Sequence, residues 1–120
     1  MYYQELEVWK KSIELVKTIY QVTEKFPQKE QFGLVSQIRR AVVSIPSNIA
    51  EGSARYSNRD TARFADIAIG SLAEVETQLI IAKELNYISN ISSVTDLLKN
   101  VYALLIGYRN YLNNDKNLTT

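Results

Sequence analysis

The sequence contains no cysteine and no histidine among its 120 residues. Without cysteine, a disulfide framework and thiol chemistry are excluded. Without histidine, the chain lacks the commonest general base and a frequent metal ligand, which argues against zinc sites and the histidine-containing iron sites of helical bundles. Helical-bundle ribonucleases that rely on an arginine–histidine pair are excluded for the same reason. We therefore expect no metal and no cofactor.

Neither sign of charge predominates, because 14 lysines and arginines face 13 acidic residues and the net charge is +1. Whole-chain charge thus indicates no particular partner. No apolar run approaches the roughly 18 residues that a membrane span needs, and the opening MYYQELEVWKK has no apolar leader segment. We expect a cytoplasmic protein without membrane contact. The length and the hydrophobic content of 46% fit a single domain over residues 1–120.

Proline is scarce, and one of the two prolines, Pro46, falls inside a helical pattern. Apolar residues continue on both sides of it at steps of three and four: Val35, Ile38, Val42, Ile45 and Ile49. Proline offers no N–H to the carbonyl of Val42, and an interior proline usually kinks a helix. The pattern therefore predicts one kinked helix over residues 31–54. The alternative is a helix break with a loop at Ser47 and Asn48.

The same periodicity predicts three further helices, over residues 5–25, 58–86 and 93–112. Pro27 ends the first of them, and Ser57 is a suitable N-cap for the third. The links are short, which favours antiparallel neighbours. The sequence thus predicts an all-α fold, an antiparallel up-down-up-down left-handed four-helix bundle whose second helix is kinked at its proline.

The predicted third helix carries apolar residues on more than one side, which exceeds what one bundle contact requires. The extra positions are Ile67, Ile69, Ile80 and Ile81. Large exposed apolar patches are rare on soluble monomers. This helix therefore predicts a homo-oligomer.

Charged residues are the only candidates for catalysis. They are Glu51, Glu74, Glu76, Arg40 and Asp66. Arginine and glutamate inside a helical bundle can perform acid–base chemistry, but no cysteine, histidine, glycine-rich phosphate loop or metal-ligand spacing accompanies them. Ion pairs or a solvated face explain them better, so we predict no catalytic residue and no enzyme.

Five of the six arginines lie within residues 36–64: Arg39, Arg40, Arg55, Arg59 and Arg63. Two acidic residues in that segment, Glu51 and Asp60, leave five minus two, or +3. Arginine grips phosphate groups bidentately, so this cluster is a candidate contact for a nucleic-acid backbone.

Arg59 and Arg63 are four residues apart and share a helix face. Together with Arg55 they form a predicted basic edge near Tyr56. The alternative is a solubilising surface in which Arg59 or Arg63 pairs with Asp66.

Several segments of the sequence also resemble a known family. The segments RRAVVSIPSNIAEGSAR and FADIAIGSLAEVETQLIIAKELNYI closely resemble the four-helix-bundle family named for 23S rRNA intervening-sequence proteins. The segments LEVWKKSIELVKTIY and FPQKEQFGLVSQIRR resemble the first helix and first turn of that family, so the resemblance covers about residues 5–112. The residues of the family motif are Ser44, Pro46, Asn48, Glu51 and Gly52.

The resemblance implies a function as well as a fold. Family members form rings of five bundles, and the accessory proteins of diversity-generating retroelements in this group bind RNA and a reverse transcriptase through a basic surface. A non-catalytic homo-oligomer, with a pentamer favoured, is therefore implied, with RNA, a protein such as a reverse transcriptase, or both as partners. The alternative is a structural or protein-interaction oligomer that binds no nucleic acid. The near-neutral chain departs from the plainly basic surface usual in nucleic-acid binders.

Overall fold

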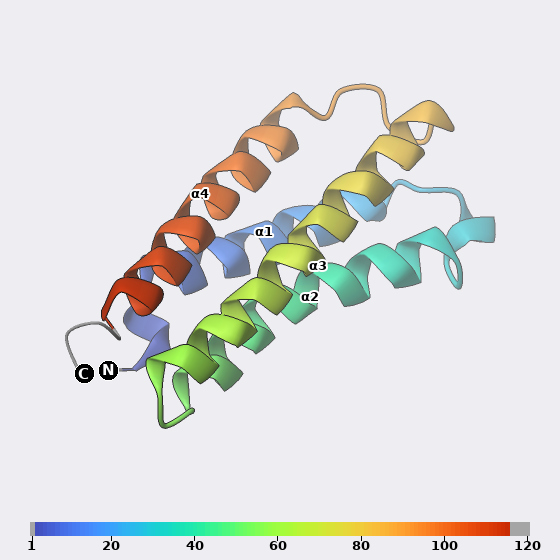
Figure 1. Cartoon of the computed structure of the whole chain (residues 1–120). Coiled ribbons are helices and arrows are strands. Elements are labelled where there is room, and N and C mark those ends of the chain that lie inside the picture. Colours follow the sequence, from blue (N-terminus) through green and yellow to red (C-terminus); the bar gives the residue numbers. More distant parts are fainter. Residues whose placement is uncertain (1, 116–120) are drawn as a thin grey trace.

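The computed structural model describes residues 2–115, which are helical apart from short connections (Figure 1). The elements are the 3-10 turns η1 (Tyr3–Glu5) and η2 (Gln28–Glu30) and the helices α1 (Glu7–Thr23), α2 (Leu34–Ser53), α3 (Asn58–Glu84) and α4 (Ser92–Asp115). Residues 2–115 contain no strand. The predicted all-α class with four helices is thereby confirmed.

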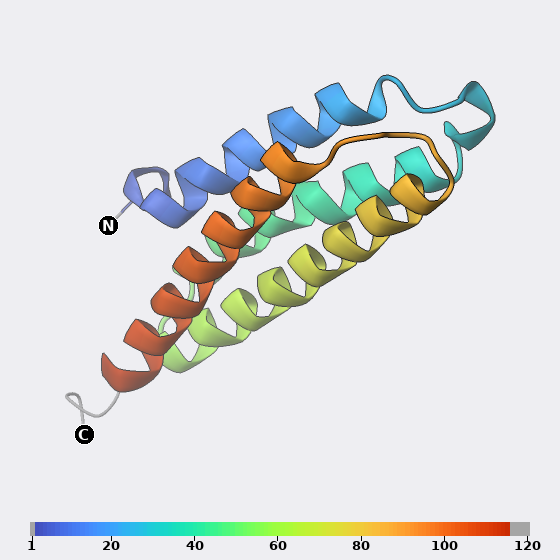
Figure 2. The same cartoon turned by 90° about the horizontal axis from the view of Figure 1, so that it is seen from above.

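The four helices lie side by side in an elongated body of 53 × 24 × 20 Å (Figures 1 and 2). Successive helices contact each other, and α1 also contacts α4, so the helices enclose a common core. The most extensive contact is between α2 and α3. In both views, η1, the α2–α3 turn and the end of α4 lie at the same end of the molecule.

The helix boundaries differ from the predicted ones by up to three residues. The largest differences are at the start of α2, which begins at Leu34 instead of residue 31, and at the end of α4, which extends to Asp115 instead of residue 112. Residues 28–30 form a 3-10 turn, and the Glu30 carboxylate accepts a hydrogen bond from the N–H of Leu34 at 3.2 Å. This side chain satisfies one of the free N–H groups that any helix start exposes. Of the predicted domain, residues 1 and 116–120 lie outside the described residues.

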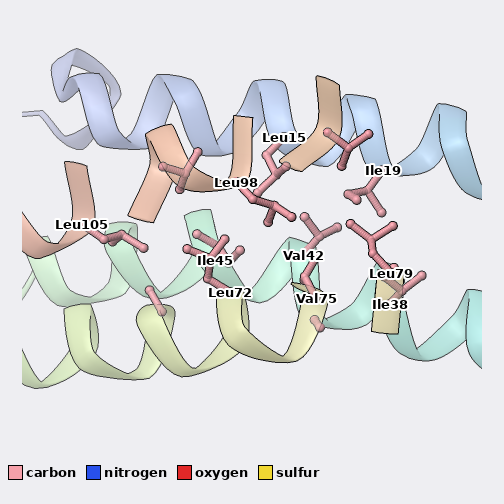
Figure 3. Packing of buried hydrophobic residues seen from close by; sticks show 14 of the residues in the cluster. Leu15, Ile19, Ile38, Val42, Ile45, Leu72, Val75, Leu79, Leu98 and Leu105 are labelled. Carbon is pink, nitrogen blue, oxygen red and sulfur yellow. The ribbon is translucent and has the colours of Figure 1, made fainter. Parts of the chain in front are cut away.

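The core is aliphatic and draws on all four helices (Figure 3). Its largest fully buried members are Leu15, Ile19, Ile38, Val42, Ile45, Ile49, Val75, Leu79, Val101 and Leu105. Burying one such side chain contributes about 1.5–3 kcal/mol. Tyr20 of α1 lies at the edge of this core and remains 39% exposed. Trp9 is half-buried there and packs edge-on against Tyr3, with ring centroids 5.5 Å apart.

A hydrogen bond closes the end of the bundle that is opposite the α2–α3 turn. The Tyr87 hydroxyl, in the α3–α4 connection, donates to the Glu30 carboxylate of η2 at 2.7 Å. This bond, followed by the one from the Leu34 N–H, lowers the pKa of Glu30. The same contact raises the pKa of Tyr87, because an ionised hydroxyl has no proton to donate. The contact thus links two connections that are far apart in the sequence.

Replacing Tyr87 by Phe is expected to raise the pKa of Glu30 toward its ordinary value. Because the folded state lowers that pKa, the bond stabilises the protein above the ordinary pKa of a glutamate, and this stabilisation is lost as pH falls through the lowered value. Tyr87→Phe should therefore be less stable than the wild type at neutral pH, by a margin that shrinks in acid. Urea unfolding at pH 7 and pH 3 measures this margin. Tyr111→Phe, at an exposed position, is the control. A margin equal at both pH values would contradict the expectation.

Candidate functional site

Two residues of the family motif, Ser44 and Gly52, lie at the contact between α2 and α3. The hydroxyls of Ser44 and Ser71 are 2.7 Å apart across this contact. The side-chain amide of Asn48 donates to the carbonyl of Ser44 at 2.8 Å and to its hydroxyl at 3.0 Å. Ser44 is therefore held from both sides, and this part of the motif joins two helices.

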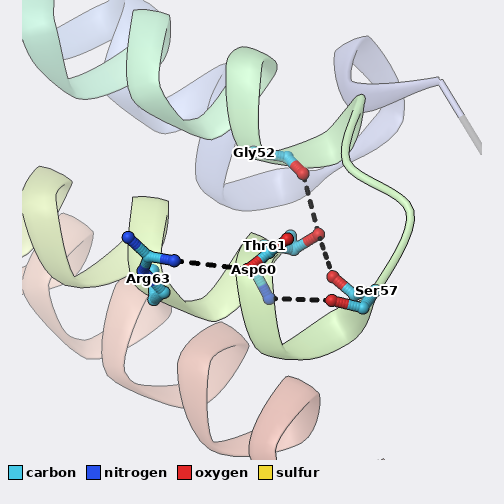
Figure 4. A network of polar contacts seen from close by, with 5 residues as sticks. All are labelled: Gly52, Ser57, Asp60, Thr61 and Arg63. Atoms are coloured by element: carbon cyan, nitrogen blue, oxygen red, sulfur yellow. Dashed lines mark hydrogen bonds and ion pairs between the residues drawn. The ribbon is translucent and has the colours of Figure 1, made fainter.

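Gly52 permits a close approach of α3 to α2. A Cβ atom added to it would lie 2.7 Å from the Cβ of Phe64. The carbonyl of Gly52 accepts a hydrogen bond from the Thr61 hydroxyl at 2.7 Å (Figure 4). The hydroxyl of Ser57 accepts from the N–H of Asp60 at 3.1 Å, which confirms the predicted N-cap of α3. The glycine, the cap and the threonine together fix the α2–α3 turn.

The remaining motif residues are Pro46 and Glu51. Pro46 lies within α2 and is buried, so the predicted continuous helix is observed and the alternative break at Ser47 and Asn48 is not. Glu51 is exposed and pairs with Arg55 at 3.5 Å. No motif residue thus points to a reaction, and all five have a place in α2 or in its contact with α3.

The first two predicted binding arginines have different surroundings. Arg39 is engaged within the bundle, because it donates to the Thr23 hydroxyl at 2.9 Å and to the Tyr20 carbonyl at 3.2 Å. Its guanidinium also lies 4.4 Å from the centroid of the Tyr20 ring. Arg40 is exposed and lines a pocket of about 290 Å³ between α2 and α3, together with Glu74. Arg39 therefore ties α2 to α1, and only Arg40 faces solvent freely.

The three arginines near the α2–α3 turn are exposed, but two of them have acidic partners. Arg55 pairs with Glu51, and its guanidinium lies 4.6 Å from the centroid of the Phe64 ring. Arg63 pairs with Asp60 at 3.4 Å (Figure 4). Arg59 makes no ion pair with any residue that the structure describes. Of these three arginines, Arg59 thus has no ionic partner among the described residues, whereas Arg55 and Arg63 are paired.

The ion pair between Asp66 and Arg59 or Arg63, considered as part of the alternative, is not observed. Asp66 accepts a hydrogen bond from Arg109 of α4 at 3.2 Å. This side of α3 faces α4, whereas Arg63 lies within reach of Asp60 one turn earlier in α3. Nothing in the local sequence around Asp66 indicates Arg109, which lies 43 residues further along the chain.

The five candidate catalytic residues do not meet in one place. Glu51 and Asp66 belong to two different ion pairs, with Arg55 and Arg109. Glu74 shares the α2–α3 pocket with Arg40, whereas Glu76 lines a different pocket between α3 and α4. Within residues 2–115, no group of three potential metal ligands comes together.

The sequence did not single out Gln78, which the structure buries between α2 and α3 with 6% of its surface exposed. Its amide nitrogen donates to the side chains of Gln37 and Glu74, each at 3.4 Å. Its carbonyl oxygen is buried without a partner. The spacing of Gln78 from Val75 places it on the buried side of α3, and this spacing was the signal that could have identified it.

Exposed hydrophobic residues concentrate on α3 and in two turns. Four aliphatic residues are about half exposed: Ile67, Ile80 and Ile81 of α3, and Leu85, which directly follows its last residue. Tyr56, in the α2–α3 turn, is fully exposed. Phe32, in the turn before α2, is 93% exposed. In the helices described, none is long and apolar enough to cross a membrane.

A partly apolar pocket of about 380 Å³ lies between α3 and α4. It is lined by Ile69, Leu72, Ala73, Glu76, Leu98, Lys99 and Tyr102. Its aliphatic floor continues the core, and its rim carries one acidic and one basic side chain. This composition suits an apolar side chain of a partner.

A comparison with protein families finds one match. The family model described as 23S rRNA-intervening sequence protein covers residues 4–107, which include all four helices in whole or in large part. A comparison with curated proteins found no match.

Proposed function

Because the chain belongs to the family of 23S rRNA-intervening sequence proteins, we propose that it is a non-enzymatic homo-oligomer that serves as an accessory module. Its proposed partners are RNA and a protein such as a reverse transcriptase. The dispersion of the five candidate catalytic residues supports a function without catalysis. The observation that carries the oligomer is the row of exposed aliphatic residues on α3.

One of the proposed subunit contacts is a ridge on α3. We define the α3 ridge as Ile67, Gly70, Glu74, Ile81 and Leu85. These residues follow one another at steps of three, four, seven and four, so they share one side of the helix. All five are exposed. An aliphatic stripe that faces water within a single subunit is a suitable contact for a second copy.

The other proposed contact is the groove between α3 and α4. We define the α3–α4 groove as the lining of the 380 Å³ pocket together with Ile80, which continues the stripe of Ile69, Ala73 and Glu76. Lys99 at the groove rim can face Glu74 of the ridge of a neighbouring subunit. The groove offers the concave surface and the ridge offers the aliphatic side chains that fit it.

The ridge and the groove are different surfaces of one subunit. A contact between the ridge of one subunit and the groove of another leaves one free groove and one free ridge on the pair, so further subunits can add until the assembly closes into a ring. A pair of identical surfaces would stop at a dimer. This geometry supports a cyclic oligomer, and the family resemblance favours five subunits.

The finer architecture is part of the same proposal. We infer that the four helices run in antiparallel up-down-up-down order with a left-handed twist. The short connections support this order, as does the position of η1 and the end of α4 at one end of the molecule (Figure 1). We also infer a kink at Pro46, because its ring crowds the carbonyl of Val42 and one helical hydrogen bond is missing.

RNA binding is proposed at the α2–α3 turn. The unpaired guanidinium of Arg59 supports it, and Arg55 and Arg63 add donors that can exchange their exposed carboxylate partners for phosphate. Exposed ion pairs are weak, about 0–1 kcal/mol, so this exchange costs little. A ring presents several such turns to one strand and thereby strengthens a weak contact. The second candidate is an oligomer that binds protein alone, which the engagement of Arg39, Arg55 and Arg63 within the chain favours.

Replacing both Arg59 and Arg63 by Gln is expected to weaken RNA binding across all sequences, because phosphate contacts carry little sequence preference. The log–log slope of affinity against salt should flatten, since each neutralised phosphate contributes about 0.7–0.9 to it. Gel-shift titrations at two salt concentrations measure both effects, and circular dichroism should remain helical. Lys83→Gln, an exposed cation at the other end of α3, is the control. Wild type that binds no RNA at low salt, or a double variant that binds unchanged, would favour the protein-binding oligomer.

A further inference from the structure

We propose that the α2–α3 turn binds an unpaired nucleotide, with its base stacked on the ring of Tyr56 and an adjoining phosphate on Arg59. The inference rests on the proposed RNA binding and specifies its ligand as a single strand. It follows from the exposure of one aromatic ring and from the charges that surround it.

Both faces of the Tyr56 ring are open. Tyr56 is fully exposed and lies in the short connection between the last residue of α2, Ser53, and the first residue of α3, Asn58. Its neighbour Arg55 does not cover it, because that guanidinium stacks on Phe64 instead. Within residues 2–115, no ring or guanidinium packs on Tyr56. Tyr56 therefore adds nothing to the core of its own subunit.

Other tyrosines of the chain contrast with it. Tyr87 donates to Glu30 and packs against Phe26, with ring centroids 5.7 Å apart. Tyr20 lies beneath the guanidinium of Arg39. A ring with two open faces on a turn held by Ser57 and Thr61 is a suitable platform for a base, since every base has a π face.

The charges around this ring favour a polyanion over an apolar partner. Three arginines and two acidic residues, Glu51 and Asp60, surround Tyr56 in the sequence, which leaves three minus two, or +1. The excess belongs to Arg59, because the other two arginines have acidic partners. Arg59 lies three residues after Tyr56. The same turn can therefore contact a base through Tyr56 and the phosphate next to that base through Arg59.

Stacking on Tyr56 requires a base that is not already paired and stacked. Bases within an RNA duplex are inaccessible to a side-chain ring, whereas unpaired bases can be splayed out and stacked on aromatic side chains. The turn is therefore expected to prefer single-stranded RNA to a duplex of the same length. It should also prefer a normal strand to an abasic strand with the same phosphates.

The experiment measures the binding of the full chain to fluorescently labelled RNA at low salt. The probes are a single-stranded oligouridine of about ten nucleotides, its abasic counterpart and an RNA duplex of equal length. Tyr56→Ser should weaken binding to the oligouridine by about 5- to 150-fold, as expected for the loss of one stacked base. Tyr56→Phe should remain within about twofold of the wild type. Phe32→Ser removes another strongly exposed turn aromatic, which lies at the opposite end of α2, and should change nothing.

The outcomes distinguish base stacking on Tyr56 from RNA binding at the α2–α3 turn. If Tyr56→Ser binds like the wild type while Arg59→Gln binds more weakly, RNA binding stands and base stacking is overturned. Equal binding of the normal and abasic strands overturns stacking as well. If no RNA binds at low salt, both proposals fail and Tyr56 is left as a contact for a protein. Circular dichroism of each variant should match the wild type, because Tyr56 touches no core residue.

Discussion

Gly52→Ala is expected to lower the free energy of unfolding by about 1–3 kcal/mol, the usual cost of excess volume in a packed contact. The added Cβ would lie 2.7 Å from the Cβ of Phe64 and 3.2 Å from the carbonyl oxygen of Thr61. Neither neighbour is the end of a flexible side chain, so α3 itself has to move away from α2. That movement also strains the hydrogen bond between the Thr61 hydroxyl and the Gly52 carbonyl.

The expected loss opposes the ordinary effect of this substitution. Glycine to alanine inside a helix stabilises the helix by about 0.8–1 kcal/mol. Gly107→Ala in α4 is the matched control, because an added Cβ there meets nothing within 4 Å. Urea unfolding should therefore show the two variants on opposite sides of the wild type. A Gly52→Ala protein as stable as Gly107→Ala would show that α2 and α3 accommodate the added methyl group without a loss in the free energy of unfolding.

Placing charges on either proposed contact surface is expected to abolish assembly. Ile67→Glu with Ile81→Glu alters the α3 ridge, and Ile80→Glu with Tyr102→Glu alters the α3–α4 groove. Each variant should be monomeric at micromolar concentration by gel filtration with light scattering, because a carboxylate buried without a partner is strongly unfavourable. The folds should survive, since all four side chains are exposed in the subunit.

Mixing the two variants tests the cyclic arrangement directly. The ridge variant retains an intact groove, and the groove variant retains an intact ridge. An equal mixture should therefore form one native contact and stop at a heterodimer of twice the subunit mass. Phe32→Glu, at an exposed position away from both surfaces, should assemble like the wild type.

Each other outcome excludes one part of the proposal. A monomeric wild type excludes the oligomer, and two variants that assemble normally exclude these two surfaces. If only one of them dissociates, the contact joins two copies of that surface and the oligomer is not a ring built from ridge and groove. If both dissociate and the mixture remains monomeric, each surface is needed for assembly but the two do not pair with each other.

Local features of the sequence were sufficient to predict the all-α class and the bounds of each helix to within three residues. Helix formation depends on local features: apolar residues at steps of three and four, Ser57 as the cap of α3, and Pro27 after the end of α1. The family motif was likewise visible as a run of residues. Its resemblance was sufficient to indicate the family, which the family model over residues 4–107 then confirmed.

Which side chains act together depends on how the helices pack, because these contacts join residues that are distant in the chain. Arg39 was predicted as a binding residue, yet the packing of α2 on α1 engages it with Tyr20. Asp66 pairs with Arg109 of α4, at a separation of 43 residues. Periodicity identifies the apolar positions of a helix, but the number and placement of its neighbours determine which of them remain exposed. The sequence indicated Ile67, Ile69, Ile80 and Ile81 as extra apolar positions. Their division into the α3 ridge and the α3–α4 groove, like the open ring of Tyr56, became recognisable once the four helices were packed.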